Sequence, residues 1–274
     1  ITAIICVLPF LIIISGSLSD NGIVVQEGYS LFPKQFTLDA YKYIFESPKG
    51  IVQAYGVTLY CTLVGTAMGL AVISLTGYVL SRKEFKYRNI ISFLIYFTTI
   101  MGGGLVPWYI MYVSVLDLKG TLTALWLPGI ASPFLIILMR TFMMGGVPDE
   151  LVDAAKIDGA GYFTIFAKVV LPISKSGLAT IGLFLALGYW NDWYHSSLFS
   201  DNSSTWSLQY YLYELINKAQ AALDVSGSAN VVINPPTQTV KLAMTVVATG
   251  PILLVYPFVQ KYFVEGITVG AVKG

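Results

Sequence analysis

The segment from Pro148 to Gly161 carries carboxylates, alanines and glycines at spacings that suit the docking of a protein partner. Pro148 ends the preceding helix, Asp149 is a favourable N-cap, and acidic residues in the next turn stabilise the positive end of a helix. Gly159 suits the left-handed position that terminates a helix. The sequence therefore predicts a helix of about two turns, followed by a sharp bend.

One face of this predicted helix is apolar and small. Its members are Leu151, Ala154, Ala155 and Ile157. Adjacent alanines let another surface approach closely, while the acidic residues favour water over lipid. We therefore expect this helix to dock in a groove on a soluble partner rather than to face the membrane.

A second group of residues could bind a polar ring-shaped solute. These candidate pathway residues are Tyr109, Tyr189, Trp190, Asn191 and Asp192. Aromatic faces beside Asn and Asp can stack on a sugar ring and hydrogen-bond to it, but Trp and Tyr also form ordinary belts at membrane surfaces. Both interpretations stay open.

Tyr109 follows an unusual stretch, Met101 to Gly104 with Pro107 after it, which interrupts a helical pattern. Transporters often place binding sites at such breaks, although a kink that only helps helix packing would look the same. Asp192 is costly in hydrocarbon, so we expect it to face an interior, a cavity or the interface.

The sequence gives little reason to expect a metal-binding site or a nucleotide-binding site. His195 is the one histidine, and both cysteines, Cys6 and Cys61, lie in apolar runs, which indicates neither a zinc site nor a disulfide framework. The sequence holds no GxxxxGK[ST] motif, so we expect this chain to bind no ATP and to have no catalytic residue.

The composition indicates which elements position these residues. Of 274 residues, 55% are hydrophobic and 11% are charged, whereas soluble domains carry about 25% charged residues. The net charge of +1 gives no reason to expect nucleic acid as a partner. The chain is therefore expected to lie in a membrane.

Six uncharged runs are long enough, or nearly so, to cross a bilayer as helices, which takes about 20 residues each. The predicted spans are about 1–18, 54–80, 90–113, 121–141, 177–198 and 242–261. The first could instead be a signal peptide, but no basic region precedes it; because the sequence begins with Ile1, we expect further residues ahead of it. The prediction is an all-α membrane protein with six transmembrane helices.

Basic residues set the orientation of these spans. The turn at 81–89 holds Arg82, Lys83, Lys86 and Arg88, and positive charge prefers the cytoplasmic side. Both termini are then predicted to be cytoplasmic. The turn could bind anionic lipid or serve only this topological role.

The segment at 148–176 resembles the EAA loop of inner-membrane subunits of ABC importers. The matching positions are Pro148, Glu150, Leu151, Ala154, Ala155, Ile157, Asp158, Gly159, Ala160, Phe166, Leu171, Pro172 and Ser174. The chain departs from the pattern at Asp153, where Glu is usual, and at Ser176, where Pro is common. The first departure keeps the charge on a shorter side chain, and the second affects only local geometry.

The resemblance extends along the chain to the carbohydrate-uptake branch of these permeases. The segments concerned are Leu127–Gly129, Met139–Phe142, Tyr189–Trp193, Val255–Phe263 and Glu265–Gly274. Within that branch the chain is similar to the maltose-type second permease, and to the subgroup that imports complex oligosaccharides such as alginate- or pectin-derived fragments.

This resemblance implies a single transmembrane domain over 1–274, with an EAA-type coupling loop at 145–176. Its residues for coupling to an ATPase would be Glu150, Asp153, Ala154, Ala155, Asp158, Gly159 and Ala160. The implied partners are a second permease subunit in a heterodimer, a dimeric ATP-binding subunit that holds ATP and Mg, an extracytoplasmic solute-binding protein, and membrane lipid. The implied location is the bacterial cytoplasmic membrane, and the implied mechanism is alternating access.

Three alternative functions fit a membrane protein of this kind. The first is a non-catalytic permease subunit for oligosaccharides, the second the same architecture for a non-sugar solute, and the third an ion-coupled transporter or intramembrane enzyme. The third class requires ionisable groups within the membrane, and only Asp192 comes near to that. The tail from Val264 to Gly274 is either frayed coil or, as in maltose-type relatives, a segment that reaches the ATPase subunits.

Overall fold

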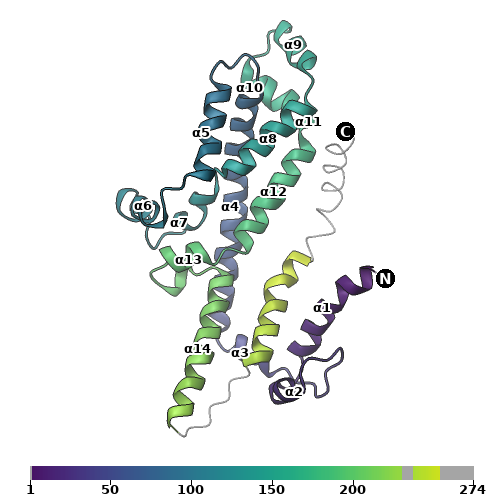
Figure 1. The fold of residues 1–274 in the computed structure, drawn as a ribbon, viewed down its shortest axis with the longest axis vertical. Coiled ribbons are helices and arrows are strands. Elements are labelled where there is room, and N and C mark those ends of the chain that lie inside the picture. The colour runs from purple at the N-terminus through teal and green to yellow at the C-terminus, as the bar shows by residue number, and fades with distance from the viewer. Residues whose placement is uncertain (1, 230–236, 254–274) are drawn as a thin grey trace. The chain divides into compact units, whose positions relative to one another are not determined.

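The computed structural model describes residues 2–229 and 237–253, with side chains at 5–221 and 237–253, and those residues are almost entirely helical (Figure 1). The helices are α1 (Thr2–Ser17), α2 (Asn21–Glu27), α3 (Asp39–Ile44), α4 (Pro48–Ser81), α5 (Arg88–Ile100), α6 (Leu105–Ile110), α7 (Thr123–Trp126), α8 (Pro133–Gly146), α9 (Asp149–Ile157), α10 (Tyr162–Ile165), α11 (Leu171–Ile173), α12 (Lys175–Trp190), α13 (Tyr194–Phe199) and α14 (Leu208–Ala229).

Shorter helical turns complete the described chain. They are the π-helical turns η1 (Met111–Val115) and η3 (Phe166–Val170), and the 3₁₀ turns η2 (Leu127–Gly129) and η4 (Ser203–Thr205). Residues 237–253 form a further helix. The described residues contain no β-strand, and one isolated bridge joins Ser19 to Phe36. The predicted all-α class is confirmed for them. The predictions for the tail, for 255–263 and for the end of the sixth span lie outside the described residues.

The chain divides into two compact units. One unit holds the described residues of 2–57, 192–197 and 202–253, and the other holds 58–191 and 198–201.

Helix α4 has 34 residues and is, among the described helices, the one long and apolar enough to cross a membrane without a break. Three further candidates are pairs of helices bent at a short interruption. They are Arg88–Ile100 with Leu105–Val115 (112°), Thr123–Gly129 with Pro133–Gly146 (48°) and Tyr162–Ile173 with Lys175–Trp190 (83°). The six predicted spans therefore stay a prediction, and the regions 90–113 and 121–141 are not single straight helices.

The bend after α5 has a local cause. Gly104 has φ +83°, a left-handed conformation that favours glycine, and it directly precedes α6. A Cβ atom added at Gly102 or Gly103 would meet no atom within 4 Å in the described structure. These two glycines therefore make no close contact with a neighbouring helix among the described residues, and both interpretations of this stretch stay predictions.

The core of the second unit lies where α4, α8, α10 and α12 meet. Ile73, Met139, Ile165 and Ile181, one from each helix, are fully buried there. A Cβ atom at Gly77 would lie 2.9 Å from Cγ of Met139, so only glycine lets α4 and α8 approach this closely.

The glycines of the Gly65-x-x-x-Gly69 motif pack against α12. A Cβ atom at Gly65 would lie 2.5 Å from Cζ of Tyr189, and one at Gly69 would lie 3.0 Å from Cδ1 of Leu185. This motif therefore does mark close helix packing.

In the first unit, the helix at 237–253 is tied to α1, α2 and α4. A Cβ atom at Gly16 would lie 2.4 Å from Cδ1 of Leu242, and the Oδ1 atom of Asn21 accepts a hydrogen bond from the backbone N–H of Gln238. The hydroxyl of Tyr55 donates to the carbonyl of Val247 at 2.7 Å.

Candidate functional site

Helix α9 lies at one end of the helical bundle of the second unit, away from α6 and α7 (Figure 1). Several large apolar side chains on and beside it face outward. Ile157 is 87% exposed, and Leu151, Tyr162 and Phe163 are also exposed. An exposed apolar surface of this kind at a loop indicates a protein contact.

The two ends of α9 differ in how well the sequence predicted them. Pro148, not Asp149, occupies the N-cap position, so Asp149 is the first helical residue and does not cap. The C-terminal end follows the prediction. Gly159 has φ +82°, its N–H donates to the carbonyl of Lys156, and the N–H of Ala160 donates to the carbonyl of Ala155. This pair of bonds is a Schellman motif, which fixes the bend after the helix.

The seven predicted coupling residues all lie on or directly after α9, but they do not share one face. The exposed members are Glu150, Asp153, Ala154, Asp158 and Gly159. Ala155 and Ala160 pack against the core, next to Val152, which is buried. The predicted small face is therefore divided: Ala155 packs inward and anchors the helix, whereas Leu151, Ala154 and Ile157 are exposed and available to a partner.

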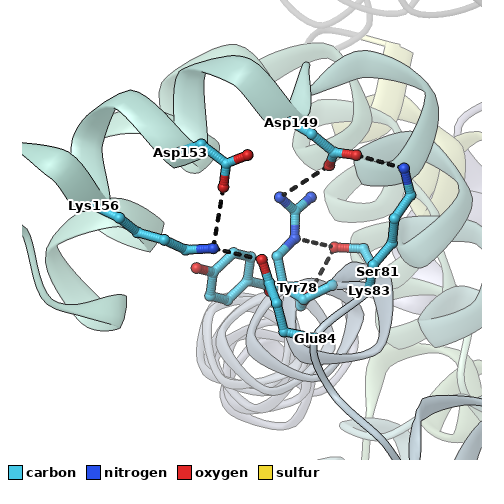
Figure 2. Close-up of polar contacts among 8 residues, drawn as sticks. Tyr78, Ser81, Lys83, Glu84, Asp149, Asp153 and Lys156 are labelled. Atoms are coloured by element: carbon cyan, nitrogen blue, oxygen red, sulfur yellow. Dashed lines mark hydrogen bonds and ion pairs between the residues drawn. The ribbon is translucent and has the colours of Figure 1, made fainter.

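Salt bridges hold α9 to the turn between α4 and α5, as Figure 2 shows. The Nζ atom of Lys83 lies 2.7 Å from Oδ2 of Asp149. The Nζ atom of Lys156 pairs with Glu84 and lies 3.3 Å from Oδ1 of Asp153. In the first pair the turn supplies the cation and α9 the anion, and in the pair of Lys156 with Glu84 these roles are reversed.

These contacts shift the pKa values of the groups involved. The hydrogen bond from Lys83 lowers the pKa of the Asp149 carboxyl, and the same bond raises the pKa of the Lys83 amine. The hydrogen bond to Glu84 is the largest cause that raises the pKa of Lys156. Each of these three shifts favours the charged form of its group.

Arg82 fixes the turn to the end of α4. Its side chain is only 8% exposed, its guanidinium carbon lies 5.4 Å from the centre of the Tyr78 ring, and its Nε atom donates to Oγ of Ser81 at 3.1 Å. Its Nη1 atom lies 3.9 Å from Oδ1 of Asp149. A small open cavity lies beside these groups; its lining residues are Ser81, Arg82, Lys83, Met144, Gly145, Val147, Pro148 and Asp149.

Sequence reasoning assigned the basic turn a topological or lipid-binding role and missed its contact with α9. The signal was present in complementary charge, because Lys83 and Glu84 stand next to each other, and residues of opposite charge, Asp149 and Lys156, lie two helical turns apart on one side of α9. Nothing in the sequence shows that Arg82 is buried.

The predicted pathway residues make contacts within the chain, and their role in a pathway stays a prediction. Tyr189 and Trp190 are buried at the end of α12. The hydroxyl of Tyr189 donates to the carbonyl of Trp126 at 2.9 Å, and its ring fills the space left by Gly65 and Gly129. Tyr189 therefore holds α12 against α4 and η2.

Asn191 and Asp192 end one helix and begin the next. The side-chain nitrogen of Asn191 donates to the carbonyl of Leu187 at 2.9 Å. The Oδ1 atom of Asp192 accepts from the backbone N–H groups of Tyr194 (3.0 Å) and His195 (3.2 Å), and its Oδ2 atom lies 2.6 Å from Nδ1 of His195. Asp192 therefore caps α13, which satisfies its charge without a ligand.

Tyr109 belongs to an aromatic cluster around Phe199. The two rings are stacked, with centroids 5.8 Å apart and planes inclined by 6°, and Trp108 and Tyr112 also contact Phe199. The salt bridge from Lys119 to Asp201 lies in the loops that flank this cluster. Tyr109 is half-buried, so part of its surface stays accessible.

Groups of three or more His, Cys, Asp or Glu side chains that could hold a metal ion are absent from the described residues. The polar side chains of the site instead pair with one another and with the backbone.

Residues 62–269 match a protein family described as "Binding-protein-dependent transport system inner membrane component". The chain is 41% identical to the protein LplC of Bacillus subtilis over 271 residues, which cover 98% of this chain and 90% of LplC. It is 39% identical over 275 residues to the polygalacturonan/rhamnogalacturonan transport system permease protein YtcP of the same organism, covering 99% and 94%.

One solved structure has a similar fold. It is the crystal structure of a bacterial ABC transporter involved in the import of the acidic polysaccharide alginate, with a TM-score of 0.81 and 28% sequence identity. The match covers 96% of this chain and 92% of that one.

Proposed function

Because this chain belongs to the family of binding-protein-dependent transport system inner membrane components, we propose that it is the permease subunit that forms half of the pathway of an oligosaccharide importer and couples to a separate ATPase through α9. The members of this family are components of transport systems, so we propose a role in transport and not in catalysis for this chain. ATP and Mg would be bound by the partner subunits.

The geometry of α9 carries this proposal. The helix is short and acidic, presents Glu150, Asp153 and Ala154 outward, and is anchored below by Val152. A sharp turn at Gly159 then returns the chain to the bundle. Such a helix can transmit a push because it cannot rotate or slide independently of the bundle.

The proposal includes the arrangement in the membrane. The chain would form a single transmembrane domain of six spans in the bacterial cytoplasmic membrane, with both termini and α9 on the cytoplasmic side. Its partners would be a second permease subunit, a dimeric ATP-binding subunit and an extracytoplasmic solute-binding protein. The basic turn beside α9 supports this orientation, since positive loops remain in the cytoplasm.

An oligosaccharide is the preferred solute, because relatives named for polygalacturonan/rhamnogalacturonan and arabinooligosaccharide transport align over nearly the whole chain. Lys and Arg are absent from long stretches such as 50–81 and 89–116. If the solute is acidic, its charge would therefore be balanced by the partner permease or by helix dipoles.

Reconstitution tests the proposal directly. The chain would be placed in vesicles with its neighbouring permease, ATPase and binding protein, and ATP hydrolysis would be measured against neutral and acidic oligosaccharides. We expect one saccharide class to stimulate hydrolysis, and we expect Asp158→Ala to abolish that stimulation. Flat hydrolysis across both classes would move the solute to another chemical class.

A further inference from the structure

Two kinds of contact join α9 to the rest of its unit. The first is covalent and apolar, through α10, η3 and α11 into α12, with Val152 and Ile165 in the core. The second is ionic, and it joins α9 to the turn that follows α4 (Figure 2).

The ionic contact uses two positions on one face of α9. Asp149 and Lys156 are seven residues apart, which is close to two full turns, so their side chains leave the same side of the helix. They meet Lys83 and Glu84, respectively, which are adjacent in the turn. Shifting α9 by one turn would leave at least one of these charges without its partner, so the charge pattern selects a single register.

The turn itself cannot move freely, because Arg82 is buried at its base. Arg82 contacts the ring of Tyr78 on α4, and Tyr78 in turn lies against Phe166 of η3, with ring centroids 5.2 Å apart. The turn is therefore fixed to the end of α4, and the ionic contact extends that rigidity to α9.

We propose that residues 82–84 act as a positioning clamp that ties α9 to α4, so that a displacement of α9 reaches α4 as well as α12. This inference rests on the proposed coupling role of α9. Exposed salt bridges add little stability, so the clamp sets the position of α9 and does not hold the fold together.

A double-mutant cycle on one salt bridge tests the clamp in the reconstituted complex. The variants are Lys83→Ala, Asp149→Asn and the two combined, and the readout is solute transported per ATP hydrolysed. Each single change is expected to lower this ratio about threefold. The double variant should lose no more than Asp149→Asn alone, because that change already removes the contact with Lys83.

Two further variants separate the clamp from general damage. Lys83→Arg keeps the charge and should keep the ratio. Lys86→Ala is the matched control: it removes a lysine from the same turn whose described contact is the ring of Tyr87, and it should leave the ratio unchanged. If loss of positive charge were the cause, Lys86→Ala would lower the ratio as much as Lys83→Ala.

A distance measurement gives a readout that needs no transported solute. With Cys6 and Cys61 replaced, spin labels at Leu63 on α4 and Leu151 on α9, both exposed, report the spread of distances between the two helices. We expect a narrow distribution in the parent complex, a broader one with Lys83→Ala, and no broadening with Lys86→Ala.

The two readouts distinguish failure of the clamp from failure of the proposed function. If the parent complex imports no saccharide, the proposed function fails, and the width of the distance distribution still decides on the clamp. An unchanged width with Lys83→Ala, or losses that simply add in the double variant, would overturn the clamp.

Discussion

Helix α9 and the segment from Tyr189 to Asp192 are both short, polar and placed at helix ends, yet they use their side chains in opposite ways. In α9 the polar groups face water or pair with a neighbouring turn, as Asp149 does with Lys83. At the end of α12, Tyr189 and Trp190 are buried, and Asp192 is used in capping the next helix.

The polar side chains of α9 form an exposed surface, whereas the side chains at the end of α12 are part of the packing between helices. Asp153 and Ala154 are exposed, whereas the ring of Tyr189 lies directly against Gly65 of α4 and Gly129 of η2. Changes in the first region should therefore affect coupling, and changes in the second should affect folding. Five experiments test that division.

Tyr189→Ala should have the largest effect, a loss of about 3 kcal/mol of stability, because it opens a cavity against Gly65 and Gly129. Tyr189→Phe keeps the ring and loses one hydrogen bond, so about 1 kcal/mol is expected. Thermal unfolding in detergent measures both. A fully stable Tyr189→Ala protein with altered transport would return this residue to the pathway.

Gly159→Val should uncouple transport from ATP hydrolysis while the protein remains in the membrane. Its left-handed φ of +82° costs a β-branched residue about 2 kcal/mol of local strain, although a Cβ atom would meet no neighbour within 4 Å. Gly159→Asn should be tolerated much better, because Asn accepts this conformation. Normal solute uptake by the valine variant would contradict the lever role of α9.

Asp192→Ala should cost about 1 kcal/mol, the usual value of a helix cap, while Asp192→Asn should retain most of it. Transport by the asparagine variant distinguishes the two roles. A residue that only caps tolerates the loss of charge, whereas a residue that contacts the solute through its carboxylate does not.

The smallest effect should come from solution conditions acting on the clamp. The Asp149 pKa is lowered from 3.8, so its contribution is present above that value and is lost only as the pH falls below it. The Lys83 pKa is raised from 10.5, so its contribution is present below that value and is lost only as the pH rises through the raised pKa. Coupling should therefore show no clamp-dependent change between about pH 6 and about pH 8.

Salt should act where pH does not. Raising ionic strength from about 0.1 M to about 1 M shortens the screening length from about 10 Å to about 3 Å, so the exposed pairs weaken. The transport ratio should fall modestly in the parent complex and less in Lys83→Ala, which has lost the Lys83–Asp149 pair and keeps the Lys156–Glu84 pair. An equal fall in both would show that salt acts elsewhere.

The sequence was sufficient to predict α9 and its end at Gly159, because caps and glycine conformations are local properties. It was insufficient for the inward packing of Ala155, which depends on the path of the chain after Gly159. The burial of Tyr189 was unpredictable for a related reason: it depends on glycines in α4 and η2, more than fifty residues away. The glycines at 102–104 were sufficient to predict a break before α6, but they did not predict the angle of the bend.

Helix α4 has a consequence for membranes of different thickness. Its uncharged run of 50–81 is about 48 Å long as a helix, whereas the hydrocarbon core of a bilayer is about 30 Å thick. The helix can therefore move along the membrane normal by several residues without drawing a charge into lipid. Its depth is set by the groups attached to its ends, among them Arg82, so a thinner or thicker bilayer should shift this helix less than hydrophobic matching alone would allow.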